Sequence, residues 1–359
     1  MYLKKILPNL FPIKSLEFIH GPDIFYQRII DMVMTAKKRI ILSSLYIGAG
    51  KREEYLIKCI RNQLKLNINL KFDLYIDKSR SYREEGNGIT MLRDLVCRYP
   101  SQSSVSLISG GTRKKLFLDS FRLPNFLNEI LGVYHVKSYI FDDNIILSGA
   151  NLSDEYFTSR CDRYILLKNE PFFCDCVLHY IKSIGANLNM ESDSYQKLSL
   201  FNSLRDSLDI FIKNNSGETH IGVIPDNRIV PTTIFLETLF KALRGRKIKI
   251  VISTAYYNIP ETLINLICSM TDLEVEVYTS DMDNNSFFKS TGIKNLVPYY
   301  YNYYLQRHLY FVEGLNQCKR IKFFVYKKPQ STFHSKGIWI YENYGELAKP
   351  IATVIGSSN

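Results

Sequence analysis

Three features are missing from this 359-residue sequence, and each absence excludes a class of protein. No apolar run is long enough for a membrane-spanning helix, which needs roughly 18 residues or more. The seven cysteines form no C-x-x-C pair, and Cys174 and Cys176 stand too close for the usual zinc knuckle, so free thiols in a reducing compartment are expected. No group of histidines and carboxylates has the spacing of metal ligands. The sequence therefore predicts neither a metal nor another cofactor.

Positive charge is what the sequence has in excess, with a formal net charge of +11. Since 46% of the residues are hydrophobic and 23% are charged, the chain is predicted to be globular. The excess charge favours an anionic partner such as nucleic acid, phospholipid or a phosphorylated substrate. A lysine-rich surface without a specific ligand is the alternative. Residues 1–20 form an N-terminal extension and a weak candidate for a targeting segment.

The chain repeats one plan twice. "FYQRIIDMVMTAKKRIILSSLYIG" (25–48) aligns without gaps against "FLETLFKALRGRKIKIVISTAYYN" (235–258). Each stretch has the pattern of an amphipathic helix, a basic turn and an apolar strand, and each is followed by a second helix and strand. Helices that alternate with strands predict α/β layers with parallel neighbours in each sheet.

Each half also carries a His-x-Lys pair, followed by a return strand that ends in Gly and Asn. Because side chains alternate along a strand, the His and the Lys share one face, and the hairpin brings the Asn back beside the His. One copy would be weak evidence, but two copies in corresponding places are a strong signal. The residues are His135, Lys137 and Asn151 in the first half, and His334, Lys336 and Asn359 in the second.

This pattern resembles the signature of the phospholipase D superfamily. The resemblance implies two pseudo-twofold-related α/β/α sandwich domains with mixed, largely parallel sheets, whose two motifs form one active site. The first copy includes Asp142 and fits closely, whereas Tyr341 stands where the second copy should have Asp. That departure favours a structural role for Asp142 at the hairpin turn over a catalytic one.

Within the superfamily the chain is similar to eukaryotic phosphatidylglycerophosphate synthases. The similar strings are "SSLYIGAG" (43–50), "RLPNFLNE" (122–129), "HVKSYIFDDNIILSGANLSDEYFTSRCDRY" (135–164), "FHSKGIW" and "TVIGSSN". The resemblance implies transfer of a phosphatidyl group from CDP-diacylglycerol to glycerol 3-phosphate, with release of CMP. It also implies a peripheral protein of the mitochondrial inner membrane, with no cofactor and no nucleic acid as partner.

The resemblance assigns a role to each motif residue. His135 would be the nucleophile that forms a phosphohistidine, and His334 the general acid and base, although the reverse assignment stays open. Both lysines would hold the non-bridging oxygens, and both asparagines would donate hydrogen bonds to them. Asp162 stands where the superfamily places a carboxylate that orients His135. The alternative for Asp162 is a surface carboxylate paired with Arg160 or Arg163.

Substrate contacts are less specific in the sequence. Arg80, Arg83 and Lys114 lie on loops after predicted strands, where open α/β sheets bind ligands, and a solvated basic loop is the alternative. Ser357 belongs to the second motif and is a further candidate. The Tyr-rich segment 298–311 and the basic segment 319–328 predict docking on an anionic membrane, with packed core aromatics as the alternative.

The predicted organisation has four parts. The extension 1–20 precedes a first domain at 21–185, a linker at 186–225 and a second domain at 226–359. Because the chain stops on the last motif residue, we expect a truncated second domain, an orienting partner for His334 near position 370, and poor activity of the 359-residue chain. Two rival hypotheses remain: a phospholipase D-type phosphodiesterase or nuclease, and an inactive homologue that binds lipid.

Overall fold

A computed structural model describes residues 11–81, 88–108, 133–189, 219–222, 232–285, 287–288, 290, 292–342, 345 and 350–356. The described chain divides into two compact units. The N-terminal unit comprises the described residues up to Ile221, apart from Ser159–Arg163. The C-terminal unit comprises Ser159–Arg163 and the described residues from Gly222 onward.

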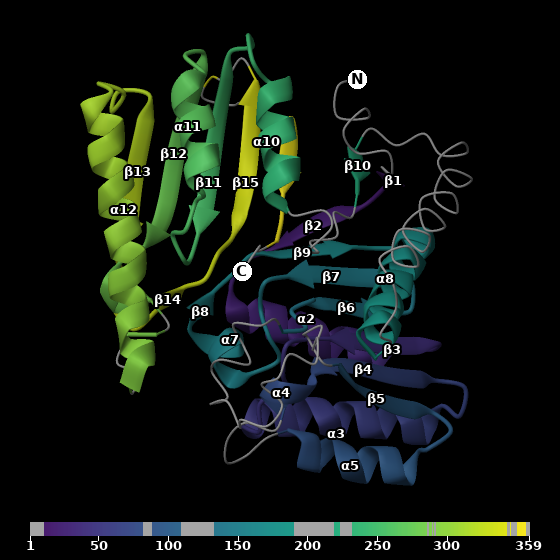
Figure 1. The fold of residues 1–359 in the computed structure, drawn as a ribbon. Coiled ribbons are helices and arrows are strands. Elements are labelled where there is room, and N and C mark those ends of the chain that lie inside the picture. Colours follow the sequence, from purple (N-terminus) through teal and green to yellow (C-terminus); the bar gives the residue numbers. More distant parts are fainter. Residues whose placement is uncertain are drawn as a thin grey trace. The chain divides into compact units, whose positions relative to one another are not determined.

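The N-terminal unit is built on a seven-stranded mixed sheet (Figure 1). Its strands, in spatial order, are β2 (Leu16–Ile19), β9 (Tyr164–Leu167), β7 (Asn144–Ser148), β6 (Ser138–Phe141), β3 (Arg39–Ser43), β4 (Lys71–Asp77) and β5 (Ser103–Ile108). β3, β4 and β5 are parallel, and the remaining neighbours pair antiparallel. A separate antiparallel pair joins β1 (Phe11–Ile13) to β10 (Thr219–Ile221).

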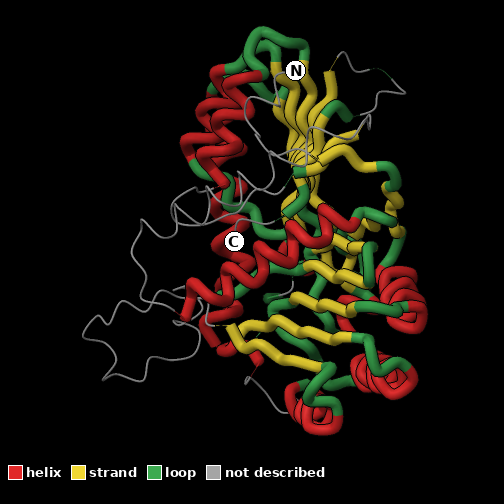
Figure 2. Tube along the Cα trace, turned by 90° about the vertical axis from the view of Figure 1, so that its right-hand side faces the viewer, coloured by secondary structure: helices red, strands yellow, loops and turns green. Residues whose placement is uncertain are grey.

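Helices cover both faces of this sheet. Figure 2 shows α2 (Pro22–Thr35), α3 (Lys51–Leu66) and α5 (Ile89–Arg98) on one face and α8 (Pro171–Asn189) on the other. The short helices α4 (Lys78–Ser81) and α7 (Asp154–Thr158) lie in connections. The apolar positions of α2 recur at helical spacing, so Phe25, Ile29 and Val33 are buried against the sheet. The Phe25 ring stacks on Tyr164 of β9, with centroids 4.3 Å apart.

The C-terminal unit contains a five-stranded sheet. Its strands, in spatial order, are β13 (Ile321–Tyr326), β12 (Leu273–Ser280), β11 (Ile248–Thr254), β15 (Gly337–Glu342) and β16 (Ala352–Val354). Its helices are α10 (Thr232–Ala242), α11 (Glu261–Ser269), α12 (Val297–Gly314) and the 3₁₀ turns η2 (Met282–Asn284) and η3 (Gly292–Leu296). In the described part of this unit, α10, α11 and α12 lie on one face of the sheet (Figure 2). A two-stranded parallel ladder joins β8 (Arg160–Cys161) to β14 (Thr332–Phe333).

The two units repeat the same strand order and directions. In the N-terminal unit β6 pairs antiparallel with β3, and β3, β4 and β5 follow in parallel. In the C-terminal unit β15 pairs antiparallel with β11, and β11, β12 and β13 follow in parallel. The predicted α/β architecture with mixed sheets is thus confirmed.

The repeat extends to single hydrogen bonds. The Ser43 hydroxyl at the end of β3 donates to the carbonyl oxygen of Val136 at 3.0 Å. The Ser253 hydroxyl at the end of β11 donates to the carbonyl oxygen of Ser335 at 3.1 Å. Val136 and Ser335 are the middle residues of the two His-x-Lys pairs, so the two motifs are fixed in the same way to corresponding strands, β3 and β11.

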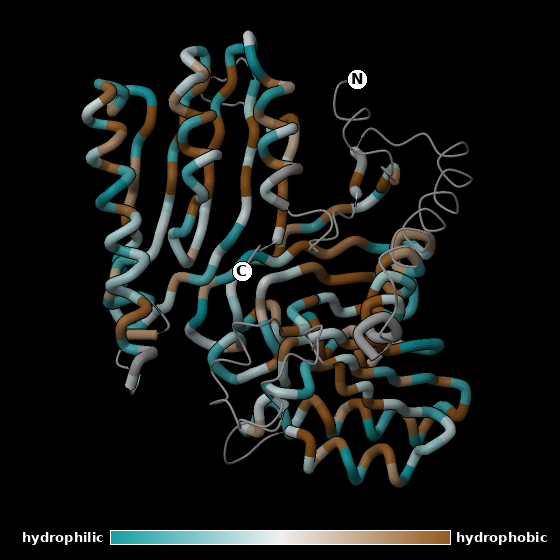
Figure 3. The backbone as a smooth tube through the Cα atoms, in the orientation of Figure 1, coloured by the Kyte–Doolittle hydropathy of each residue, from teal (hydrophilic) through white to brown (hydrophobic). Residues whose placement is uncertain are grey.

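Each unit has its own hydrophobic core, between the sheet and its helices (Figure 3). In the N-terminal unit the strands β3, β4 and β9 are almost continuously buried, as expected for a sheet covered on both faces. In the C-terminal unit β12 alternates between buried and accessible residues, which is typical of a sheet covered on one face. Among the described residues, no helix is long and apolar enough to cross a membrane.

Candidate active site

The second motif brings a histidine, a lysine and a carboxylate together inside the C-terminal unit. His334 directly follows β14, Lys336 directly precedes β15, and both side chains are buried. The Nδ1 atom of His334 lies 2.6 Å from Oδ2 of Asp162, whose side chain is only 1% exposed. A carboxylate without a proton can only accept, so Nδ1 carries the hydrogen and Nε2 carries the lone pair of the neutral ring.

The short ladder between β8 and β14 places this carboxylate. Arg160 pairs with Thr332 and Cys161 pairs with Phe333. The backbone N–H of His334 then donates to the carbonyl oxygen of Cys161 at 2.9 Å. The register therefore brings the residue after Cys161 alongside His334.

This arrangement corrects the role predicted for Asp162. The sequence predicted that Asp162 orients His135 and that the partner of His334 lies near position 370. In the structure the carboxylate bonds to His334, and its burial excludes the alternative of a surface Asp. The physical reason is that Ser159–Arg163, between α7 and β9, belongs to the C-terminal unit. Distance along the chain from His135 does not reveal this pairing.

The Lys336 ammonium lies against the imidazole of His334. Its Nζ is 3.0 Å from both ring nitrogens and 3.0 Å from the carbonyl oxygen of His334. Nδ1 carries a hydrogen, and an atom equidistant from both ring nitrogens does not lie in line with the lone pair of Nε2. We therefore interpret this contact mainly as a charge beside the ring. The Tyr256 ring lies 5.4 Å from the same ammonium, within the range of a cation–π contact.

Burial and neighbouring charges shift both ionisation equilibria. Burial, with the Lys336 charge, lowers the pKa of His334 to about 4, against the opposing effect of Asp162. Burial also lowers the pKa of Lys336 to about 8, and Asp162 again opposes this shift. At neutral pH this cluster therefore holds a neutral imidazole beside a lysine that is mostly protonated.

The first motif repeats part of this geometry in the N-terminal unit. Lys137 is buried, and its ammonium donates to the carbonyl oxygen of His135 at 3.1 Å, as Lys336 does to His334. Asn151 is buried, and its Oδ1 accepts from the backbone N–H of Leu45 at 3.3 Å. Because the oxygen of this amide is turned toward the protein, its NH₂ is the group that can donate to a phosphate.

A buried carboxylate that the sequence analysis missed holds the start of the first motif. Asp77 ends β4, and its Oδ2 accepts from the backbone N–H of Tyr134 at 2.7 Å. The Tyr134 hydroxyl in turn lies 2.6 Å from the Ser43 hydroxyl. The residue before His135 is thus fixed through both its backbone and its side chain. The available signal was an acidic residue at the carboxyl end of a predicted parallel strand.

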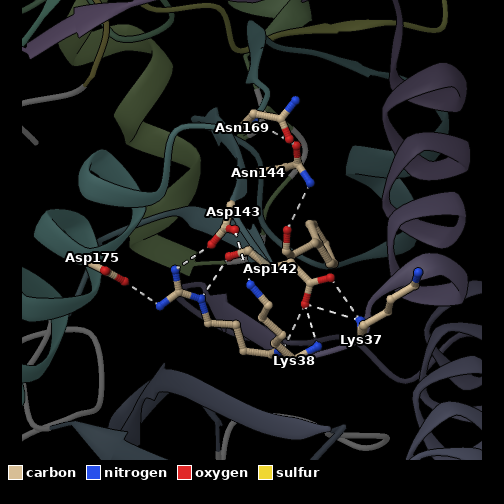
Figure 4. A network of polar contacts seen from close by, with 9 residues as sticks. Lys37, Lys38, Asp142, Asp143, Asn144, Asn169 and Asp175 are labelled. Atoms are coloured by element: carbon tan, nitrogen blue, oxygen red, sulfur yellow. Dashed lines mark hydrogen bonds and ion pairs between the residues drawn. The ribbon is translucent and has the colours of Figure 1, made fainter. Parts of the chain in front are cut away.

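Asp142 has a structural role. It occupies the hairpin turn between β6 and β7 with a φ of 52°, a conformation that Asp tolerates better than most residues. Its carboxylate accepts from the backbone N–H groups of Lys37, Lys38 and Arg39 at 2.7–3.0 Å (Figure 4). These bonds fasten the turn to the start of β3.

The C-terminal unit uses another device where Tyr341 replaces the expected Asp. Glu342, the next residue, accepts two hydrogen bonds from the Arg246 guanidinium, at 2.8 and 2.5 Å. This bidentate ion pair also joins the end of the motif hairpin strand to the start of the central strand. The substitution at position 341 therefore leaves the hairpin anchored.

Of the other predicted site residues, the structure describes only Arg80. Arg80 lies in α4, is half-buried, and donates its backbone N–H to Asp77 at 3.0 Å. Arg83, Lys114, Ser357 and Asn359 lie outside the described residues. Among the residues that are described, no three His, Cys, Asp or Glu side chains gather in the manner of a metal site.

Comparison with known proteins identifies the family. No family model matches the chain. A Saccharomyces pastorianus protein named CDP-diacylglycerol–glycerol-3-phosphate 3-phosphatidyltransferase is 31% identical, with all of this chain and 78% of the relative covered. A mitochondrial Gallus gallus protein of the same name is 29% identical, with all of this chain and 74% of the relative covered.

A solved structure supports the fold. The phosphatidylserine synthase of Haemophilus influenzae superposes with a TM-score of 0.71 at 20% identity, covering 94% of this chain and 79% of that protein. At this identity the likeness concerns the fold alone. Taken with the sequence relatives, it shows that the chain is an enzyme of the CDP-diacylglycerol–glycerol-3-phosphate 3-phosphatidyltransferase family, with a fold like that of the phosphatidylserine synthase.

Proposed function

We propose that this enzyme transfers a phosphatidyl group from CDP-diacylglycerol to the hydroxyl of sn-glycerol 3-phosphate, giving phosphatidylglycerophosphate and CMP. The named relatives are the first support. The observation that carries the proposal is the buried Asp162–His334–Lys336 cluster, because an oriented imidazole beside an ammonium suits the transfer of a charged phosphoryl group.

In the first chemical step, His135 attacks the phosphorus of the phosphatidyl group. A bond forms between the imidazole nitrogen and phosphorus, and the bond from phosphorus to the oxygen of CMP breaks. His334, once protonated, gives its proton to that departing oxygen. The cations of Lys137 and Lys336 hold the non-bridging oxygens and offset the charge that develops on them.

In the second step the hydroxyl oxygen of glycerol 3-phosphate replaces the His135 nitrogen on phosphorus. The neutral His334 takes the proton of the glycerol hydroxyl, whose oxygen attacks phosphorus while the bond from phosphorus to His135 breaks. Asp162 holds the Nδ1–H of His334 and stabilises the imidazolium that forms. This cycle returns both histidines to their starting state.

The lowered pKa of His334 favours the neutral imidazole, which fits its role as the base in the second step. A bound phosphate brings negative charge close to the ring, which favours protonation and raises the pKa of His334. Substrate binding itself can thus prepare His334 for its acid role in the first step. The reverse assignment of the two histidines is the alternative outcome of the experiment below.

The experiment is to replace each histidine by Ala and to measure CMP release and lipid product from vesicles with CDP-diacylglycerol and glycerol 3-phosphate. Both His135→Ala and His334→Ala should lose at least about 100-fold in rate, the usual contribution of a positioned acid–base group. An acid-labile phosphatidyl adduct should form on His135 and be absent from His135→Ala. The matched control is His179→Ala, at an exposed position on α8.

The results separate the rival functions. An adduct on His334 instead of His135 reverses the two roles but keeps the reaction. Nicked DNA without lipid product would replace the proposal by a nuclease. Full activity of both histidine variants would overturn the proposed chemistry altogether.

We also propose that the C-terminal unit docks on an anionic membrane, and that this is the mitochondrial inner membrane. The names of two relatives state a mitochondrial location. α12 buries Pro298, Leu305 and Val312 against its own unit. Its opposite face exposes Tyr299, Tyr300, Tyr303 and Tyr310. Amphipathic Tyr rings favour the headgroup region of a bilayer.

Exposed cations of the same unit add an electrostatic contribution. Lys319, Lys322, Lys327 and Lys328 are all exposed, on β13 and its two flanks. Cations near an anionic bilayer contribute about 1 kcal/mol each to binding. Tyrosines and lysines on one unit together suit a peripheral enzyme whose donor substrate is a lipid.

A further inference from the structure

Arg160 lies on the same side of the β8–β14 ladder as the catalytic imidazole. It pairs with Thr332, and its Nε lies 3.4 Å from the Thr332 hydroxyl. Side chains alternate along a strand, so Arg160 shares its side with Asp162, and Thr332 shares its side with His334. The bond between Asp162 and His334 shows that these two sides coincide.

The guanidinium is also close enough to act on the site electrostatically. Its charge lowers the pKa of His334 and the pKa of Lys336, in each case as a smaller contribution than burial. This half of the site thus places two cations, Arg160 and Lys336, near the imidazole of His334.

The proposed reaction involves more than one phosphate near the histidines. The transferred phosphorus is held at the imidazole and the ammonium. The second phosphate of the nucleotide is separated from it by one bridging oxygen. The phosphate of glycerol 3-phosphate lies three carbons from the attacking hydroxyl, so it must be bound farther from the ring.

The register of the β8–β14 ladder places the cation of Arg160 farther along the strand than the Asp162 carboxylate that bonds to His334. Arg160 precedes Asp162 by two residues, which corresponds to about 6.6 Å along a parallel strand. A planar guanidinium also matches the geometry of a phosphate better than a lysine does. Position and side-chain type thus agree in favouring the more distant phosphate.

We propose that Arg160 binds the phosphate of the acceptor and so selects glycerol 3-phosphate over uncharged alcohols. This inference rests on the function proposed above. Arg160 acts as a specificity residue: it holds the acceptor so that its hydroxyl meets the phosphorus, and it takes no part in bond cleavage.

The test compares steady-state kinetics of Arg160→Gln and Arg160→Lys with the unaltered enzyme. Arg160→Gln should raise the KM for glycerol 3-phosphate at least about tenfold, as expected for loss of a charge-assisted hydrogen bond, and leave the KM for CDP-diacylglycerol unchanged. The KM of Arg160→Lys for glycerol 3-phosphate should lie between the values of the unaltered enzyme and Arg160→Gln. Rates with plain glycerol as acceptor should be the same in all three.

The matched control is Arg244→Gln. Arg244 is exposed and precedes the start of β11, whereas Ser253 lies near the other end of that strand. It should change neither KM. A rise confined to the KM for CDP-diacylglycerol, or equal for both substrates, would overturn the inference and assign Arg160 to the nucleotide. Should Arg160→Gln fail to fold, the Arg160→Lys data decide in the same way. An unaltered enzyme that makes no lipid product from glycerol 3-phosphate would instead contradict the proposed function.

Discussion

At the scale of single residues, Lys336 should set the alkaline limit of activity. Because its pKa is lowered to about 8, the ammonium loses its proton as the pH rises through that value. The neutral amine no longer attracts the phosphate. We therefore expect kcat/KM for CDP-diacylglycerol to fall above about pH 8, as measured by CMP release across the pH range.

The variant Lys336→Arg tests the assignment. A guanidinium stays charged far above pH 8, so this variant should lose the alkaline limb while it retains reduced activity. Bound phosphate favours the charged form of Lys336 and so raises its pKa in the enzyme–substrate complex. The alkaline fall of kcat should therefore lie at higher pH than the alkaline fall of kcat/KM. A limb that persists unchanged in Lys336→Arg would assign it to a different group.

The residue scale also shows what local pattern can and cannot predict. His135, Lys137, His334 and Lys336 were predicted because their spacing is repeated in the sequence. Asp162 was predicted as a carboxylate of the site, but the prediction that it orients His135 was wrong, because it bonds to His334. That partner lies 172 residues away, across a pairing of two-residue strands. Spacing along the chain carries no information about such a pairing.

At the scale of elements, the Asp142 carboxylate should contribute mainly to stability. It fastens the β6–β7 turn to three backbone N–H groups at the start of β3. Hydrogen bonds to a charged group contribute about 1.5–3 kcal/mol each in favourable cases, and their effects do not add fully. We expect Asp142→Ala to lower the free energy of unfolding by about 3 kcal/mol, measured by denaturant unfolding.

The neighbouring variant Asp143→Ala is the control. The ion pairs of Asp143 with Lys38 and Arg39 are partly exposed, so the loss of this carboxylate should cost less than about 1 kcal/mol. Folded Asp142→Ala enzyme should keep its turnover rate. A catalytic role for Asp142 would appear as the opposite result, a slow enzyme of undiminished stability.

The long helices and strands could be predicted from the sequence, whereas the shortest strands could not. The helix and strand of 25–48 and of 235–258 have clear periodicity, and both pairs form as expected: α2 with β3, and α10 with β11. β8 and β14 have two residues each, which is too short for any alternation of polar and apolar side chains. Their pairing depends on tertiary contacts.

At the scale of the whole molecule, the exposed tyrosines of α12 should govern membrane binding. The double variant Tyr299→Ser/Tyr303→Ser removes two large amphipathic rings and leaves the buried face of the helix intact. Even partial burial of such rings in a bilayer is worth more than 1 kcal/mol. We expect binding to vesicles with anionic lipid to weaken at least about tenfold, as measured by co-sedimentation.

The control is Tyr55→Ser, which removes an equally exposed tyrosine from α3 of the N-terminal unit. It should leave vesicle binding unchanged. Raised salt should weaken the binding of every variant, because the lysine contribution is screened. Undiminished affinity of the double variant would remove α12 from the membrane surface.

The segment Ser159–Arg163 belongs to the C-terminal unit, and this has a consequence for how the protein can be divided. Five residues encoded within the first half complete the unit formed by the second. The halves are consequently not interchangeable cassettes, despite their shared plan. A gene split in the segment 186–225 would yield a second fragment whose histidine has lost its carboxylate, unless a peptide spanning 159–163 were supplied in trans.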